Sequence, residues 1–192
     1  MRLNLGCGNS KLPGFVNVDK MAACQPDQVV DLERVPWPWP DDSVEEVMLS
    51  HVLEHLGATA GAYFAVIKEL YRVCRDGAKV TVVVPHPRHD SFLADPTHVR
   101  VVTPLGLELF SQTRNREWQE KGFANTPLGL YLGVDFAITA VNMLPDARWR
   151  QRLQRGQATM EQLMEAEKSQ LNVMEQITVT LQAVKPQGPD RR

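Results

Sequence analysis

The 192-residue sequence predicts an α/β fold with a mostly parallel sheet and an antiparallel edge at its C-terminal end. Short apolar runs alternate with segments of helical spacing, which is typical of a parallel sheet. Residues 80–84 are a continuous apolar and β-branched run, as expected for a strand buried on both faces. The alternating segment 177–184 suits a half-exposed strand, and its long separation from strand-like residues near Phe136 favours an antiparallel pair.

The N-terminal third predicts strands at 3–5, 15–18 and 29–30. Too few residues separate these strands for long helices, so the N-terminal helices are expected to be abbreviated. Pro36, Pro38 and Pro40 then argue against a regular helix or a central strand in the following loop.

Later segments continue the alternation. A strand is expected at 44–49, a helical stretch from near His51, and a longer helix at 61–75 that ends at Asp76-Gly77. Thr103-Pro104 is typical of a helix start. The last expected elements are strand-like residues within 131–143, one long polar helical segment at 148–169 and the strand at 177–184. Residues 1–185 are predicted to form a single domain, with 186–192 as a C-terminal tail.

Composition excludes several classes of protein. The formal net charge is −2, whereas a general nucleic-acid binder is more often basic. Three cysteines support neither a disulfide framework nor a Cys-rich zinc site, so a reducing, cytoplasmic location is expected. No apolar run approaches the length needed to span a membrane, and no membrane partner is expected. The basic segment 148–152 is either a solvated helix face or support for a homodimer.

A glycine turn, Gly6-Cys7-Gly8, directly follows the first expected strand, and Asp19 closes the second. Glycines allow a ligand to approach the backbone, and an acidic residue at the end of the next strand can accept hydrogen bonds from ribose hydroxyls. The turn lacks the third glycine of a dinucleotide fingerprint, and the short span to Asp19 leaves little room for a phosphate-binding helix. NAD and P-loop ligands are therefore disfavoured. A plain tight turn followed by a surface Asp is the alternative.

Several segments together resemble a known family. Residues 3–9, Leu-Asn-Leu-Gly-Cys-Gly-Asn, look like motif I of the class I S-adenosylmethionine-dependent methyltransferases. Asp31-Leu32, the Ser-His-Val-Leu-Glu-His-Leu segment 50–56 and the helix and turn segments 69–73 and 76–78 follow in the family's order. The resemblance covers about residues 1–85. It implies a Rossmann-like fold and S-adenosylmethionine as the cofactor.

The resemblance also implies roles for individual residues. The backbone around Gly6, Cys7 and Gly8 would hold the amino-acid part of the cofactor, and Asp19 would bind the ribose. Asp31 would accept from the adenine amino group, with Leu32 beside the ring, and Ser50 and His51 would lie near the methionine end. Trp37 and Trp39 either cover the adenine or pack the loop. The first connections are shorter than the family's, so the pocket is expected to be open, or closed by the C-terminal half or another subunit.

The loop after the fifth expected strand holds three of the five histidines, His86, His89 and His98. Ligands of open α/β sheets lie beyond the carboxyl ends of strands, so this loop is expected to face the acceptor. The three histidines are candidate general bases, because histidine exchanges protons near neutral pH. Arg88 or Arg100 could hold an anionic acceptor group.

Two alternatives for this loop remain. Side-chain to backbone hydrogen bonds could simply order it. A metal could bind in it, because the His-x-x-His spacing of His86 and His89 is permissive, but these residues lie in a proline-broken loop and not on a helix, and the sequence predicts no metal. The ligand types considered are His86, His89, Asp90, Asp95 and His98.

The Asp-Pro-Thr-His segment 95–98 resembles a subgroup of the same family that is often associated with modification of bacterial polysaccharides or small molecules. The acceptor is therefore expected to be a small molecule, with a hydroxyl of a sugar or related metabolite as a candidate. Residues 50–53 are not the Asn/Asp-Pro-Pro-aromatic signature of amino-methylating DNA enzymes, and no nucleic-acid partner is expected. A base is needed only where the acceptor atom carries a proton. The other classes considered are a non-catalytic cofactor-binding or scaffold protein and an unrelated nucleotide-binding oxidoreductase.

Overall fold

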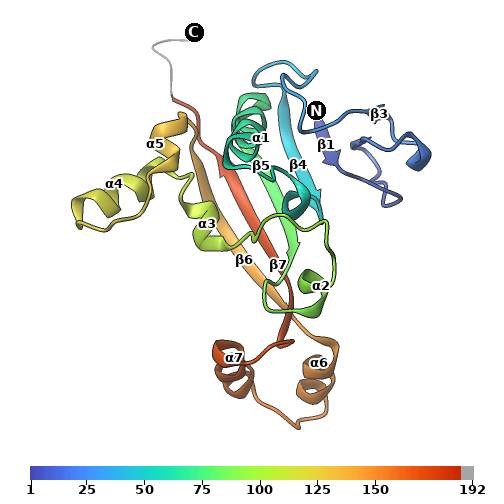
Figure 1. The fold of residues 1–192 in the computed structure, drawn as a ribbon, viewed down its shortest axis with the longest axis vertical. Coiled ribbons are helices and arrows are strands. Elements are labelled where there is room, and N and C mark those ends of the chain that lie inside the picture. The colour runs from blue at the N-terminus through green and yellow to red at the C-terminus, as the bar shows by residue number, and fades with distance from the viewer. Residues whose placement is uncertain (187–192) are drawn as a thin grey trace.

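A computed structural model describes residues 1–186, which build one seven-stranded sheet of order β3-β2-β1-β4-β5-β7-β6 (Figure 1). β1 to β5 run parallel, β7 is antiparallel to β5, and β6 is antiparallel to β7. The predicted fold class, a mostly parallel sheet with an antiparallel C-terminal edge, is therefore confirmed. The strands are β1 (Arg2–Leu5), β2 (Val16–Asp19), β3 (Gln28–Val29), β4 (Val44–Ser50), β5 (Cys74–Pro85), β6 (Phe136–Pro145) and β7 (Met174–Ala183).

The longest helix, α1 (Ala60–Val73), connects β4 to β5 and packs on one face of the sheet (Figure 1). Thr59 caps it, because the Thr59 hydroxyl accepts from the Ala62 amide. The other helices are η1 (Ala22–Cys24), η2 (Leu53–His55), α2 (Asp90–Leu93), α3 (Pro104–Glu108), α4 (Gln112–Glu120), α5 (Leu128–Leu132), α6 (Ala147–Gln154) and α7 (Met160–Ser169).

Turns, rather than a helix, connect β1 to β2, as the short spacing predicts. The buried Asn4 and Asn17 side chains organise this connection. Asn4 Nδ2 donates to the Ser10 carbonyl and to Asn17 Oδ1, each at 2.9 Å. Asn17 Oδ1 also accepts from the Leu12 amide at 2.8 Å, and the Asn17 amide donates to Asp27 Oδ2 at 2.8 Å. Buried amides therefore satisfy the polar backbone that a helix would otherwise pair internally.

The end of α1 corrects the predicted helix 61–75. The helix ends at Val73, and Asp76-Gly77 lies inside β5. The β4–β5 register shifts here, with Val44 opposite Cys74 but Glu46 opposite Lys79. Gly77 has φ +74°, which allows the irregularity in the strand. The residues that the sequence pattern predicts as a helix stop are therefore part of β5.

The C-terminal segment 148–169 is two helices, not one. α6 and α7 are separated by a turn at Gly156, where φ is +66°. Thr159 begins α7 with a capping box, in which its side chain and that of Gln162 bond each other's backbone amides. Tyr131 likewise lies in α5, so the predicted strand-like stretch becomes a strand only at Phe136.

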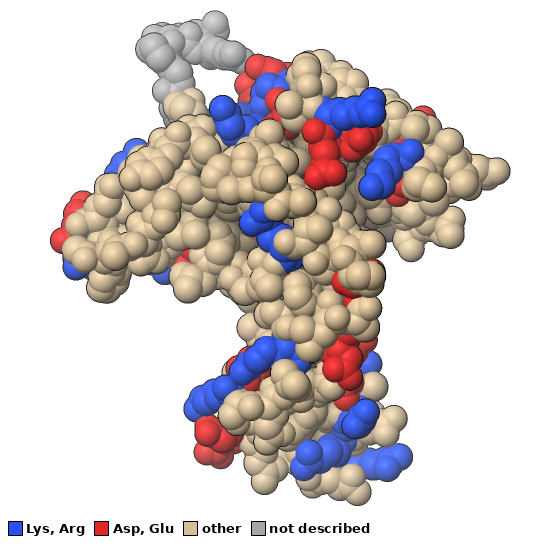
Figure 2. Space-filling view, viewed as in Figure 1, with Lys and Arg blue, Asp and Glu red and all other residues tan. Residues whose placement is uncertain are grey.

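α6 and α7 project from the far end of the β6–β7 hairpin (Figure 1). They enclose a small apolar cluster that is separate from the main core. This cluster contains Leu163, Ala166, Val173 and Met174. Figure 2 shows side chains of both signs on this projection. Within residues 1–186, each helix is too short or too polar to serve as a membrane span. The predicted tail begins at Pro186, and its residues 187–192 lie outside the described part of the chain.

Candidate functional site

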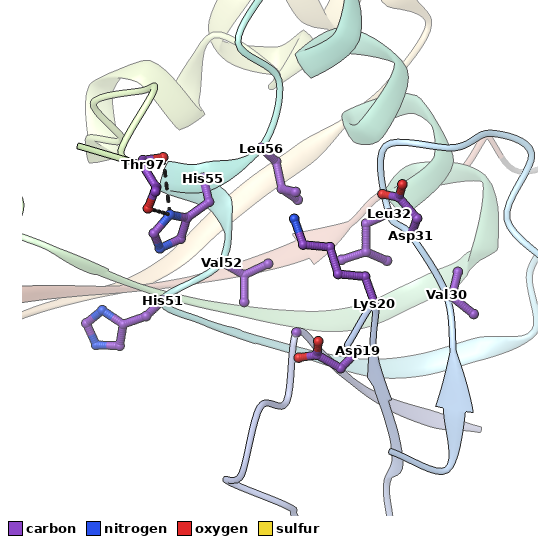
Figure 3. A pocket seen from close by; sticks show the side chains of 11 residues that line it. Asp19, Lys20, Val30, Asp31, Leu32, His51, Val52, His55, Leu56 and Thr97 are labelled. Carbon is purple, nitrogen blue, oxygen red and sulfur yellow. Dashed lines mark hydrogen bonds between the residues drawn. The ribbon is translucent and has the colours of Figure 1, made fainter. Parts of the chain in front are cut away.

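A cavity of about 380 Å³ opens beside the carboxyl ends of β1, β2 and β4 (Figure 3). This is where the strand order reverses, with β1 between β2 and β4, and ligands of open α/β sheets bind at such a point. Five residues predicted for the cofactor line it: Gly6, Asp19, Asp31, Leu32 and His51. Six further residues line it that sequence reasoning did not select: Lys20, Val30, Val52, His55, Leu56 and Thr97.

The cavity has two chemically different ends (Figure 3). Asp19 and Asp31 form one, which we call the carboxylate end. His51, His55 and Thr97 form the other, which we call the histidine end. The carboxylate end follows directly from strands β2 and β3, whereas the histidine end joins the segment after β4 to a loop far along the chain.

Asp19 ties the glycine turn to β2. Its Oδ2 accepts from the Gly8 amide and its Oδ1 from the Met21 amide, each at 2.8 Å. A carboxylate has about four lone-pair positions, so acceptor capacity remains for a ligand. Gly6 has φ +67°, and a Cβ there would overlap the Val52 side chain. Glycine at this position is therefore required by the turn and by Val52.

Asp31 and Leu32 form the other wall of the carboxylate end. Asp31 Oδ1 accepts from the Glu33 amide at 3.1 Å, and Arg34 Nε lies 3.3 Å from Asp31 Oδ2. The Leu32 carbonyl accepts from Trp37 Nε1 at 3.0 Å. Trp37 is 3% exposed and packs edge-on against Trp39, with ring centroids 5.7 Å apart. The two tryptophans therefore pack the loop, and neither lines the cavity.

Three residues predicted for the cofactor lie outside the cavity lining: Cys7, Gly8 and Ser50. Cys7 is 4% exposed, and its thiol lies 3.4 Å from the Gly8 carbonyl oxygen. Burial, followed by the Asp19 charge, raises the pKa of this thiol, so it is a small core residue. Ser50 is exposed at the end of β4. Roles for these three residues remain predictions.

His51 stands at the histidine end in an unusual conformation, with φ +55°. Its Nε2 lies 3.2 Å from Gln176 Oε1 and its Nδ1 lies 3.4 Å from Glu54 Oε1. The contact with Glu54 raises the pKa of His51, against the opposing effect of its partial burial. Because both ring nitrogens face acceptors, the surroundings favour the protonated imidazolium.

The predicted bases His86 and His89 do not line the cavity. His86 is 6% exposed and faces α7, with Nε2 3.6 Å from Glu167 Oε1, and burial lowers its pKa. His89 caps α2, where its Nδ1 accepts from the Ser91 amide at 3.1 Å. His89 Nε2 lies 3.4 Å from Asp146 Oδ2. Both rings hold the loop to the α6–α7 projection, and their assignment as bases stays a prediction.

The third predicted base, His98, lies closer to the cavity. Its ring stacks on Phe92, with centroids 5.1 Å apart, and lies 4.6 Å from the ring of His55. His55 lines the cavity and was not selected from the sequence as a site residue. The signal was present in the His-Val-Leu-Glu-His segment, where His55 is four residues after His51.

Comparisons with solved structures identify the fold. A SAM-dependent methyltransferase from Archaeoglobus fulgidus aligns with a TM-score of 0.59 at 18% identity, over 94% of this chain and 85% of that one. The chain has the fold of class I methyltransferases. A variant of the 16S rRNA (adenine(1408)-N(1))-methyltransferase from Catenulisporales acidiphilia aligns with a TM-score of 0.53 at 14% identity, over 97% and 86%. The cyclase SpnF also aligns, with a TM-score of 0.52 at 14% identity, over 95% and 75%.

No protein-family model matches the sequence, and no curated protein does. Identities of 14–18% show a shared methyltransferase-type fold and nothing finer.

Proposed function

We propose that this protein transfers a methyl group from S-adenosylmethionine to a small-molecule acceptor, with a hydroxyl of a sugar or related metabolite as the acceptor group. The observation that carries the proposal is the cavity at the sheet's switch point, with carboxylates at one end and histidines at the other. A methyltransferase-type fold supports the same ligand class.

The carboxylate end suits the adenosine part of this cofactor. Asp19 keeps acceptor capacity beside the glycine turn, where ribose hydroxyls would donate to it. Asp31 offers a second acceptor, and Leu32 supplies an apolar surface for the adenine. A phosphate-bearing cofactor fits less well, because turns rather than a helix follow the glycine residues after β1 and leave no helix N-terminus for a phosphate there.

The histidine end suits the acceptor. Transfer needs the acceptor atom in line with the sulfonium, so orientation supplies much of the rate. The positions at this end are fixed by contacts of 3.4 Å or less, through Glu54 and Gln176 for His51 and through Thr97 for His55. An acceptor held between His55 and the cofactor would have a proton acceptor at hand, because His55 Nδ1 faces Thr97 and its other ring nitrogen has no protein partner within residues 1–186.

Calorimetry of cofactor binding tests the proposal. S-adenosylmethionine and S-adenosylhomocysteine should bind with one site per chain, and NAD should not bind. Matched variants Asp19→Ala and Asp76→Ala separate the cavity from the rest of the surface, because Asp76 lies in the β5 irregularity. Binding of NAD alone, or equal loss of affinity in both variants, would contradict the assignment.

The alternative is a protein that binds the cofactor without transferring a methyl group. It is favoured by one observation: His86 and His89 are engaged in contacts with α7 and α2 rather than with the cavity. Cofactor binding without release of S-adenosylhomocysteine, across a panel of hydroxylated acceptors, would favour this alternative.

A further inference from the structure

Three side chains that could bind a metal converge beside the histidine end: Glu54, His55 and His98. One potential ligand atom from each lies within 4.8 Å of those of the other two. Glu54 and His55 belong to η2, whereas His98 follows α2. The backbone holds the two segments together, because the Val99 amide donates to the Glu54 carbonyl at 2.9 Å.

Glu54 is the first independent sign of a bound cation. It is 0% exposed, and neither of its carboxylate oxygens has a hydrogen-bond partner within residues 1–186. Its one ion-pair contact within 4 Å among the described residues is with His51, whose Nδ1 lies 3.4 Å from Oε1 without hydrogen-bond geometry. An ionised carboxylate out of water needs a close partner, because desolvation costs several kcal/mol per ion. The Glu54 side chain therefore leaves acceptor capacity that a cation would satisfy.

The tautomer of His55 follows from its neighbours. Its Nδ1 lies 3.3 Å from the Thr97 carbonyl and 3.0 Å from Thr97 Oγ1. A carbonyl only accepts, and the Thr97 hydroxyl donates its own hydrogen to Asp95 Oδ1 at 2.6 Å. His55 Nδ1 must therefore carry the proton, which leaves the Nε2 lone pair free in the neutral ring.

His98 is arranged in the same way. Its Nδ1 lies 2.8 Å from the Phe92 carbonyl, so Nδ1 is again the donor. Its Nε2 is 3.8 Å from Asp95 Oδ2, too far for a hydrogen bond. Metal-binding histidines commonly donate one ring N–H to a carbonyl, which fixes the tautomer and turns the other nitrogen to the metal. Two adjacent histidines here share that arrangement.

We propose that Glu54, His55 and His98 bind a divalent first-row transition-metal ion at the histidine end of the cavity. Two imidazole nitrogens and one carboxylate oxygen suit zinc and its neighbours better than Mg²⁺, which prefers oxygen ligands. Three protein ligands leave coordination positions open to an exogenous oxygen.

The ion would also activate the acceptor hydroxyl for methyl transfer, an inference that rests on the proposed function. A hydroxyl bound to the metal loses its proton to solvent more readily than a free one. Its oxygen then forms the bond to the methyl carbon as the carbon–sulfur bond breaks, and S-adenosylhomocysteine leaves. Acceptors with a second oxygen beside the first would chelate the ion and be preferred.

Metal binding is tested without the cofactor. The full chain is stripped with EDTA, dialysed and titrated with Zn²⁺ by calorimetry and with Co²⁺ by visible absorption. We expect one equivalent to bind. His98→Ala and Glu54→Gln should each weaken binding by about 10- to 100-fold or more, since even residues behind the ligands have effects of this size. His89→Gln is the matched control, because His89 lies in the same loop outside the cluster, and it should bind as the wild type does.

Thr97→Val keeps the proposal falsifiable where a ligand variant fails to fold. It keeps the side-chain shape and removes the hydroxyl beside His55 Nδ1, so affinity should fall by about 10-fold. The proposal is overturned where the wild type binds no stoichiometric metal, where His98→Ala and Thr97→Val bind like the wild type, or where Mg²⁺ displaces Co²⁺ freely. If the wild type binds the cofactor but no metal, the proposed metal site is refuted and the proposed function is not. The reverse result refutes the proposed function alone.

Discussion

The two ends of the cavity are built by different means. At the carboxylate end, Asp19 and Asp31 stand at the ends of neighbouring strands or just beyond them, and parallel pairing fixes their positions. At and beside the histidine end, His55 and His98 are 43 residues apart and meet through loop contacts. The first kind of site is encoded locally, whereas the second depends on tertiary packing. Variants should therefore affect the two ends independently.

The largest difference is expected from the histidines in a methyl-transfer assay. His98→Ala should lower the rate by about 100-fold or more and leave cofactor affinity unchanged, because it removes a proposed ligand of the ion that would bind the acceptor hydroxyl. His86→Ala and His89→Ala should keep most of the rate, because their rings contact α7 and α2. The measurement is release of S-adenosylhomocysteine at saturating cofactor. Similar rates in all three variants would remove the distinction drawn here between these histidines.

The buried charge at the histidine end makes a second prediction, on stability. In EDTA, Glu54→Met should stabilise the protein by about 1–3 kcal/mol, the cost of a buried polar group without a hydrogen-bond partner, because neither Glu54 oxygen has such a partner within residues 1–186. With saturating Zn²⁺ the order should reverse, because the variant lacks a ligand. Urea unfolding under both conditions measures the two free energies. A destabilised variant in EDTA would show that Glu54 is satisfied without a cation.

At the carboxylate end, Asp19→Ala should weaken cofactor binding by about 1–3 kcal/mol, the scale of a lost charged hydrogen bond. Asp19→Asn should lose less, because the amide oxygen still accepts from the Gly8 amide. Calorimetry measures both affinities, and circular dichroism checks the fold. Unchanged affinity in a folded Asp19→Ala protein would place the ribose elsewhere.

The smallest expected effect concerns acid stability outside both ends. Burial lowers the pKa of His86 below its ordinary 6.5, with Glu167 opposing and Arg88 and His89 adding to the shift. The unfolded chain therefore takes up a proton before the folded one as the pH falls. Stability from this group is full above pH 6.5 and is lost as the pH falls toward the folded pKa. His86→Gln should show a flatter unfolding free energy from pH 7 to 5. An equally steep curve would show that other groups dominate.

Sequence patterns predicted most of the fold because strands and glycine turns are local features. The apolar runs placed every parallel strand within a few residues, apart from the longer β5, and Gly6 and Asp19 lie where the first two strands imply. The single helix expected at 148–169 was wrong because helical spacing continues across Gly156, whose positive φ ends α6. The Asp76-Gly77 helix stop was wrong because the same residues serve a strand irregularity.

The histidine end was harder to predict. The conformation of the loop determines which histidines lie together, and nothing in the sequence spacing of the histidines distinguishes His98 from His86 and His89. A glutamate in a polar helical segment is typical of a solvent-exposed charge, yet Glu54 is fully buried. Its position is tied to a distant segment, because the Val99 and Arg100 amides both donate to the Glu54 carbonyl, and such a long-range interaction has no local sequence signal.

The β6–β7 hairpin closes the α6–α7 projection at its base, where the Asp146 amide donates to the Val173 carbonyl at 2.8 Å. The α6–α7 projection therefore leaves and rejoins the sheet at one point, as an insertion between two paired strands. A short turn in its place would leave the β6–β7 pairing intact. It would also remove Glu167 and release Arg88 and His86, which α7 now holds. Exchange of this projection would thus alter the loop beyond β5 while the sheet and the glycine turn stay unchanged.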